Sequence, residues 1–200
     1  MTQLVRTSEQ SIGTSAVGRS LLHSSMPPQD SAEYDALRAT IRERGTARTW
    51  VFVAGLTAWA GLMLGAGALG GAPLLSVLPL IVLAGSFEAV FALHVSVERI
   101  GRYLQVFHAD GWEDAAMSFG VPLAGLGVDP LFTSLFAAAA LCNFVPVLEA
   151  GPVPAEWVGI GGVHLLFLFR LVLARRVSSR QRSADLARFQ QLKDARTRRP

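Results

Sequence analysis

Charged side chains are scarce in this chain of 200 residues, where they account for 16% of the sequence against 51% for hydrophobic residues. Residues 49–87 contain no Asp, Glu, Lys or Arg at all. Because about 20 apolar residues cross a bilayer once, this uncharged stretch is long enough for two passes. The composition therefore excludes an ordinary soluble globule and indicates an integral membrane protein.

Cysteine and recognisable catalytic motifs are almost as rare. Cys142 is the only cysteine, which excludes an intramolecular disulfide, and its place in an apolar run predicts a small buried hydrophobic side chain. The first 30 residues lack the features of a cleaved signal peptide, so we expect the first membrane helix to direct insertion. No nucleophile elbow, P-loop, dinucleotide fingerprint, zinc-ligand spacing or internal repeat is present, which favours a protein that is not an enzyme.

The apolar runs predict an all-α integral membrane protein, an antiparallel four-transmembrane-helix bundle with a cytoplasmic amphipathic pre-helix and a basic C-terminal tail. The predicted segments are a disordered N-terminal segment at 1–29, the pre-helix at 30–48, the transmembrane domain at 49–176 and the tail at 177–200. The four spans are expected at about 50–69, 74–97, 131–148 and 155–174, with a cytoplasmic loop at 99–129.

Capping signals support helices outside the spans. Asp30 and Glu33 have the spacing of a capping box, and apolar residues recur after them at helical spacing. We therefore expect an amphipathic helix at the membrane surface that ends before Gly45. Asp110 and Glu113 repeat the capping-box spacing and predict a short interfacial helix inside the loop.

Basic residues are distributed unevenly around the spans. They precede the first span, follow the second and fill the tail, whereas the turns at 70–73 and 149–153 contain no Lys or Arg. Because positive residues stay on the cytoplasmic side, both termini are predicted to be cytoplasmic. Enrichment in Ala, Gly and Arg favours a bacterial protein, and hence the plasma (inner) membrane. Basic flanks of apolar runs also favour contact of the tail with anionic lipids over binding of nucleic acid.

Two charged residues lie inside the predicted spans. Glu88 comes 15 residues after Pro73, and Arg170 comes 16 residues after Pro154. Since both spans start at the outer face, a rise of about 1.5 Å per residue puts the two side chains at nearly the same depth. We predict an ion pair between them, because charges within spans find partners inside the bundle. Alternatively, Arg170 reaches the headgroups, and Glu88 stays protonated as a structural group or serves as a proton-coupled site.

Histidines and nearby acids are weaker candidates. His94 and Glu98 are four residues apart and hence on one helix face, where they could form a hydrogen-bonded pair. With His108 and Asp110 they are weak candidate metal ligands, although the spacing of these residues also fits a capped turn. His94 and His164 are weak candidate haem ligands, but their offsets from the outer helix ends differ by about 16 Å, which argues against a haem. No cofactor is predicted.

Asn143 and a glycine pair indicate contacts between helices. Asn143 is interpreted as a hydrogen-bonding residue between spans and belongs to the predicted intramembrane polar site together with the charged pair. Gly61 and Gly65 form a GxxxG pair, which favours close packing either within the bundle or between two copies of the chain. Pro79 is expected to kink the second span.

Three functions are compatible with these features. The leading hypothesis is a non-catalytic accessory or structural subunit of a membrane complex, with another membrane protein or a second copy as its partner. The alternative is a small oligomeric proton-linked transporter that uses Glu88. The third is a haem- or metal-dependent membrane redox protein. A transporter requires the Glu88 carboxyl group for transport, whereas a structural subunit requires it at most for stability.

Overall fold

A computed structural model describes residues 28–70, 72–108 and 130–198. These residues contain no strand, and their elements are α2 (Pro28–Ala68), the 3-10 turn η1 (Pro73–Ser76), α3 (Val77–Phe107), α5 (Pro130–Glu149) and α6 (Pro154–Thr197). Four ranges are long and apolar enough to cross a membrane: Ser31–Ala68, Pro73–Phe107, Phe132–Glu149 and Pro154–Thr197. The predictions of an all-α class and of four helices capable of spanning a membrane are thereby confirmed.

The chain divides into two compact units, Met1–Arg38 and Ala39–Pro200. In the first, the described residues are helical, and Arg38 Nη2 donates to the Tyr34 hydroxyl at 2.8 Å. Residues 1–27, predicted to be disordered, lie outside the described residues, as does the interfacial helix predicted after Asp110. All contacts between helices given below lie within the second unit.

The predicted pre-helix and the first span belong to one helix. We expected an end near Gly45, but α2 continues through this position to Ala68. Thr46 Oγ1 donates to the Arg42 carbonyl at 3.0 Å, and Thr49 Oγ1 donates to the Gly45 carbonyl at 3.3 Å, so helical geometry persists on both sides of the glycine. A glycine inside a helix costs only about 1 kcal/mol, which the flanking turns outweigh.

Pro79 does not kink the second span. α3 begins at Val77, so the proline is the third residue of the helix. At that position a backbone N–H has no acceptor within the helix, and its absence removes no hydrogen bond. The chain enters α3 through η1, where the Ser76 hydroxyl donates to the Pro73 carbonyl at 2.7 Å. The predicted kink is therefore wrong.

The last span and the tail, predicted as separate segments, form the single helix α6. The tail part of α6 stays beside α3. Lys193 Nζ donates to the Val106 carbonyl at 2.7 Å, and the ring of Phe189 lies 5.7 Å from that of Tyr103 in a T-shaped contact. These contacts hold the charged end of α6, which lies beyond the apolar span, against α3.

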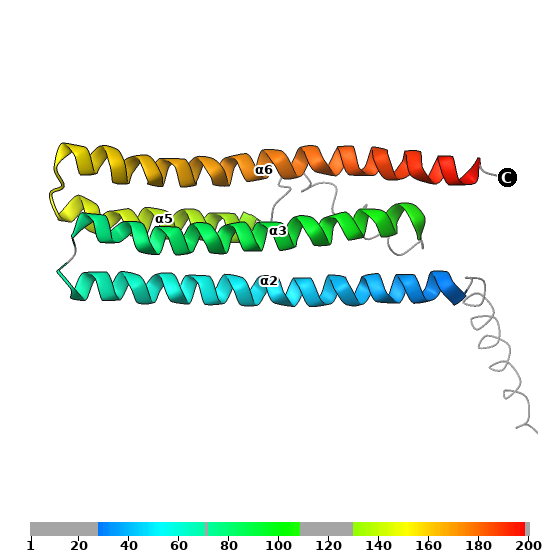
Figure 1. Cartoon of the computed structure of the whole chain (residues 1–200), viewed down its shortest axis with the longest axis horizontal. Helices are drawn as coiled ribbons and strands as arrows, with labels where there is room; N and C mark the ends of the chain where they lie inside the picture. The colour runs from blue at the N-terminus through cyan, green and yellow to red at the C-terminus, as the bar shows by residue number, and fades with distance from the viewer. Residues whose placement is uncertain (1–27, 71, 109–129, 199–200) are drawn as a thin grey trace, which may run out of the picture. The chain divides into compact units, whose positions relative to one another are not determined.

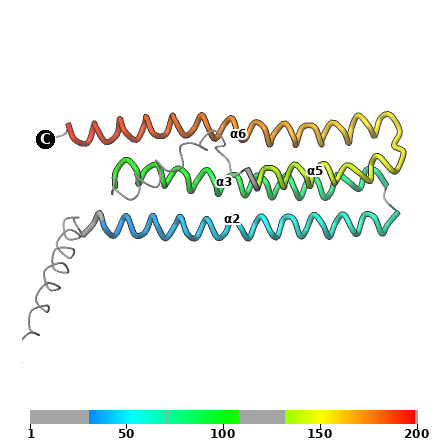
Figure 2. The backbone as a smooth tube through the Cα atoms, turned by 180° about the vertical axis from the view of Figure 1, so that it is seen from behind, coloured from blue at the N-terminus to red at the C-terminus, as the bar shows by residue number. Residues whose placement is uncertain are grey.

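α3, α5 and α6 lie side by side and share an apolar core (Figures 1 and 2). Phe136 of α5 is fully buried, and its ring lies 5.5 Å from that of Phe87 of α3. Phe87 in turn lies 6.1 Å from Phe167 of α6. Edge-to-face contacts of this kind contribute about 0.5–1.5 kcal/mol beyond the burial of the rings. The aromatic cluster therefore ties the three helices together.

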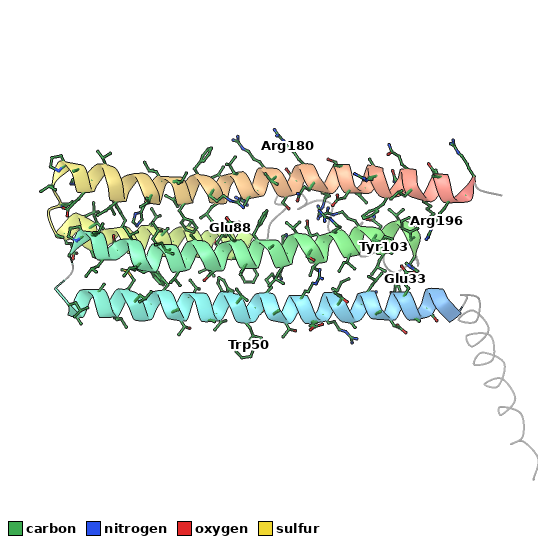
Figure 3. All side chains as sticks on the ribbon, viewed as in Figure 1. Glu33, Trp50, Glu88, Tyr103, Arg180 and Arg196 are labelled. Atoms are coloured by element: carbon green, nitrogen blue, oxygen red, sulfur yellow. The ribbon has the colours of Figure 1, made fainter. Side chains whose placement is uncertain are left out.

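α2 is covered less than the other helices. In its most apolar window 6% of the residues are buried, against 33%, 33% and 28% in the other three. Gly55 lies directly against the Ser86 side chain of α3, and the ring of Phe52 lies 4.6 Å from that of Phe132. Trp50 is 69% exposed and points away from α3 (Figure 3). Most of the apolar surface of α2 thus faces outward.

The GxxxG pair of α2 makes no close packing contact within the described part of the chain. A Cβ atom placed on Gly61 or Gly65 meets nothing within 4 Å. Packing within the bundle, one of the two interpretations of this pair, therefore has no contact to support it among the described residues. Contact with another chain stays a prediction.

Gly55→Ala is expected to push α2 away from α3. The new methyl group overlaps the hydroxyl and the Cβ of Ser86, and a Cβ atom cannot rotate away. We expect the free energy of unfolding in detergent to fall by about 1–3 kcal/mol, the usual cost of overpacking. Gly61→Ala, in open space on the same helix, is the control and should not lower stability. Equal unfolding curves for the two variants would contradict this contact.

Candidate functional site

Glu88 of α3 and Arg170 of α6, predicted to pair, lie against each other. Arg170 Nη2 donates to Glu88 Oε2 at 2.7 Å. The guanidinium group also lies over the rings of Phe91 and Phe87, at 5.3 and 5.8 Å from their centroids, and gains a cation–π contact. The pair is not sealed, because 48% of the Glu88 side chain and 36% of the Arg170 side chain are exposed.

Asn143 connects four segments of the chain, and its side chain is fully buried. The amide nitrogen donates to the Ser76 carbonyl at 2.8 Å and lies 3.0 Å from Nε2 of His164. The amide oxygen accepts from Trp59 Nε1 at 3.2 Å. Both amide protons and one oxygen lone pair are therefore used, so the side chain links α5 to α2, η1 and α6 at once.

The contacts of His164 assign one tautomer to its ring. Nδ1 lies 2.8 Å from the Ile160 carbonyl, which can only accept, so Nδ1 carries the proton. Nε2 then accepts from Asn143. The ring of Phe144 covers one side of the imidazole, with 4.9 Å between the ring centroids. Both ring nitrogens are thus bonded within the protein, which leaves neither for a haem or a metal.

A second charged cluster joins α3 to the tail part of α6. Arg102 is only 2% exposed, and its guanidinium nitrogens lie 2.6 Å from Glu98 Oε2 and 2.6 Å from Asp185 Oδ2. Arg182 lies 3.4 Å from Glu98, and Arg99 lies 3.5 Å from Asp185. Each carboxylate therefore serves two guanidinium groups. The two carboxylates bind the buried Arg102 most closely, so the positive charges of Arg99 and Arg182 are only partly neutralised.

In the sequence, Arg102 is one of the basic residues that follow the second span and indicate the cytoplasmic side. One signal was present: Glu98 precedes Arg102 by four residues, the favourable order for a helical ion pair. No signal pointed to Asp185, because its contact requires α6 to continue beside α3 beyond the apolar span.

His94 of α3 faces α2. Its Nδ1 is 3.0 Å from Arg48 Nη1, and its Nε2 is 3.6 Å from Glu98 Oε1. An arginine can only donate, so Nδ1 accepts and the proton of the neutral imidazole faces Glu98. The structure thus brings the predicted partners His94 and Glu98 together and adds Arg48, which the sequence did not indicate.

Those weak metal and haem candidates that the structure describes do not converge. Among the described residues, no group of three His, Cys, Asp or Glu side chains is arranged to hold a metal ion. His108 is buried at the end of α3, where its backbone N–H donates to the Leu104 carbonyl at 2.8 Å, and Asp110 lies outside the described residues. His94 and His164 belong to two separate hydrogen-bonded clusters, so they do not face a common haem.

Cys142 is exposed, and its interpretation as a buried side chain is wrong. The neighbouring Asn143 takes the inward position instead. Successive residues of a helix are rotated by about 100°, so an inward asparagine turns the preceding residue away from the core.

Comparison with known proteins adds no assignment. No family model, curated protein or solved structure matches the chain.

Asn143→Leu is expected to destabilise the fold. It keeps the branched shape of the side chain but leaves Trp59 Nε1, the Ser76 carbonyl and His164 Nε2 without their partner. We expect a loss of about 1–3 kcal/mol in the free energy of unfolding in detergent, because hydrogen bonds between membrane helices are individually weak. Cys142→Leu, one residue earlier and exposed, is the matched control. A loss no larger than that of the control would show that the cluster is dispensable.

Glu88→Gln and Arg170→Gln should each destabilise the protein, and the double variant should recover part of the loss. Each single change leaves one polar partner uncompensated beside the apolar core. The expected loss is about 1–2 kcal/mol, less than for a sealed pair because both side chains are partly exposed. A double-mutant cycle on unfolding free energies measures the coupling.

Glu149→Gln, an exposed carboxyl at the end of α5, is the control for these variants. Proton uptake by vesicles that contain the purified protein is measured in parallel. Additive losses of stability would contradict a structural pair. A stable Glu88→Gln variant with no proton uptake, against uptake by the unmodified protein, would establish a transport role instead.

Proposed function

We propose that this chain is a non-catalytic multi-pass membrane protein that serves as an accessory or structural subunit of a membrane complex. The observation that carries the proposal is that the charged pair and the buried amide within the apolar helices bond to other side chains. Glu88 is paired with Arg170, and Asn143 is bonded to Trp59 and lies against His164. Intramembrane polar groups used in this way hold helices together.

The proposal includes an antiparallel four-helix bundle in a bacterial inner membrane, with both termini in the cytoplasm. Two observations support this topology. The turns that join α2 to α3 and α5 to α6 lie at the same end (Figure 1). Residues 69–73 and 149–153 contain no Lys or Arg, whereas basic residues flank the opposite ends of the apolar runs of α2, α3 and α6. The basic tail is proposed to meet anionic lipids on that side.

The outward surface of α2 is the proposed partner surface. Leu64 is 77% exposed, and Gly61 and Gly65 beside it are open to the outside. Small residues at this spacing let a second helix approach closely, which is how helices associate where lipid and leucine are equally apolar. A transmembrane helix of another protein fits this surface.

A proton-linked transporter is the second candidate, and one observation favours it. The Glu88 side chain is 48% exposed and lines an open cleft of about 570 Å³. Two other hollows between helices are far smaller, at about 10 Å³ beside His94 and about 30 Å³ beside Ser76, whereas a third, of about 330 Å³, lies between Tyr103 and Phe189. The cleft therefore does not continue through the two small hollows as a path for a solute.

A photoreactive residue in place of Leu64 should form an adduct of one defined mass in native membranes. The same residue in place of Val158, which is 78% exposed on α6, is the matched control and should contact lipid only. Gly61→Leu should abolish the Leu64 adduct by blocking close approach, whereas Gly162→Leu on α6 should leave it unchanged. Mass spectrometry of the adducts and of stoichiometric co-purifying proteins is the measurement.

The mass of the adduct distinguishes the alternatives. A different protein at constant stoichiometry supports the subunit proposal, and a second copy of the chain identifies a homo-oligomer. Lipid adducts alone at Leu64, from a protein purified without any partner, would contradict the subunit proposal and favour transport through Glu88.

A further inference from the structure

An open cleft of about 570 Å³ lies where α2, α3 and α6 meet. Its lining includes three arginines from three helices, Arg44, Arg99 and Arg170, and one carboxylate, Glu88. Apolar side chains, among them Phe91, form the rest of one wall. The cleft is therefore both basic and apolar, unlike the charged cluster around Arg102.

The positive charges of the cleft are only partly neutralised. Glu88 compensates Arg170 at 2.7 Å. Arg99 lies 3.5 Å from Asp185, but that carboxylate is bound more closely by the buried Arg102, and 56% of the Arg99 side chain is exposed. Arg44 donates to a neutral hydroxyl, which does not compensate its charge. The guanidinium groups of Arg44 and Arg99 are therefore available to bind an anion.

That hydroxyl belongs to Ser96, which brings Arg44 and Arg99 to the same wall. Arg44 Nη1 donates to Ser96 Oγ. Ser96 precedes Arg99 by three residues, so the two lie on one face of α3, a single turn apart. Paired guanidinium groups match the oxygens of a phosphate better than ammonium groups do.

The level of the cleft fits a phospholipid. Counted from the ends that carry the short turns, Arg44, Ser96 and Arg99 lie at about 35–39 Å, and Phe91 lies at about 27 Å. The hydrocarbon core is about 30 Å thick and the headgroup layer extends beyond it. Arg44 and Arg99 therefore reach headgroup level, and Phe91 lies at the level of the acyl chains.

We propose that this cleft binds one anionic phospholipid, whose phosphate lies between Arg44 and Arg99 and whose acyl chain lies along Phe91. The inference rests on the membrane placement given under the proposed function. Basic pockets between helices on the cytoplasmic side suit acidic headgroups, because the charge attraction adds to the apolar contact.

The headgroup preference has one further indication. Gln181 lines the cleft, and its Oε1 atom is buried without a hydrogen-bond partner among the described residues. A hydroxyl-bearing headgroup supplies a donor for this oxygen, and such a bond removes the cost of a buried unsatisfied acceptor. Phosphatidylglycerol combines the phosphate with such hydroxyls and is the probe of choice.

The test is native mass spectrometry of the full chain after removal of co-purified lipid. Phosphatidylglycerol or phosphatidylcholine with identical acyl chains is added in increasing amounts. The unmodified protein should retain one phosphatidylglycerol in preference to phosphatidylcholine. The double variant Arg44→Gln with Arg99→Gln should bind phosphatidylglycerol about 30-fold more weakly, since each basic residue at an anionic surface contributes about fivefold.

Arg176→Gln with Arg180→Gln is the matched control, because it removes two positive charges from α6 outside the cleft. Both residues are exposed, and Arg180 points away from α3 (Figure 3). This variant should keep the affinity within about threefold. Equal losses in both double variants, or no headgroup preference in the unmodified protein, would overturn the inference.

Two further arms resolve the remaining outcomes. Arg44→Lys with Arg99→Lys keeps both charges and should retain the preference for phosphatidylglycerol, which covers the case in which the glutamine variant does not fold. Displacement of the lipid by an equal concentration of glycerol phosphate would overturn the inference in favour of a soluble anion. Loss of lipid preference with an intact Leu64 adduct would refute this inference and leave the proposed function standing.

Discussion

The structure depends on one constraint: a polar group within hydrocarbon must find its partner inside the protein, because no water is present to supply one. Asn143 meets this constraint by contacting three other segments, and Arg170 meets it with a carboxylate and two aromatic rings. Apolar packing alone leaves the rotation of a helix about its axis poorly determined, since lipid tails are as apolar as leucine. The polar contacts determine that rotation, and for the lightly covered α2 they act together with the close approach of Gly55 to Ser86.

Depth along the membrane could be predicted from the sequence, whereas rotation could not. Counting residues from two turns was enough to place Glu88 and Arg170 at one level, and the structure puts them 2.7 Å apart. The partners of Asn143 depend on which way three other segments face, and hydropathy carries no such information when a helix is apolar on all sides. For the same reason, the sequence predicts a buried Cys142, whereas in the structure this side chain is exposed.

Helix continuity was also hidden from the sequence. Hydropathy changes sharply near Gly45 and again at the start of the tail, and both changes were interpreted as boundaries. The backbone hydrogen bonds of a helix form equally well between apolar and polar residues. α2 and α6 therefore continue through both positions. Where α6 leaves the apolar region, the buried Arg102 and its two carboxylates take over the role that the phenylalanine cluster has between the spans. The contacts between α3 and α6 thus change from apolar to ionic along their length.

The length of α6 has a mechanical consequence. Its 44 residues extend over about 66 Å, roughly twice the thickness of the hydrocarbon core. Helices adjust to bilayers of different thickness by tilting. Over the roughly 35 Å that project beyond the core, a tilt of about 5° moves the tip by about 3 Å. Because Arg102 binds α3 to this part of α6, a tilt of α6 would displace the end of α3 together with it.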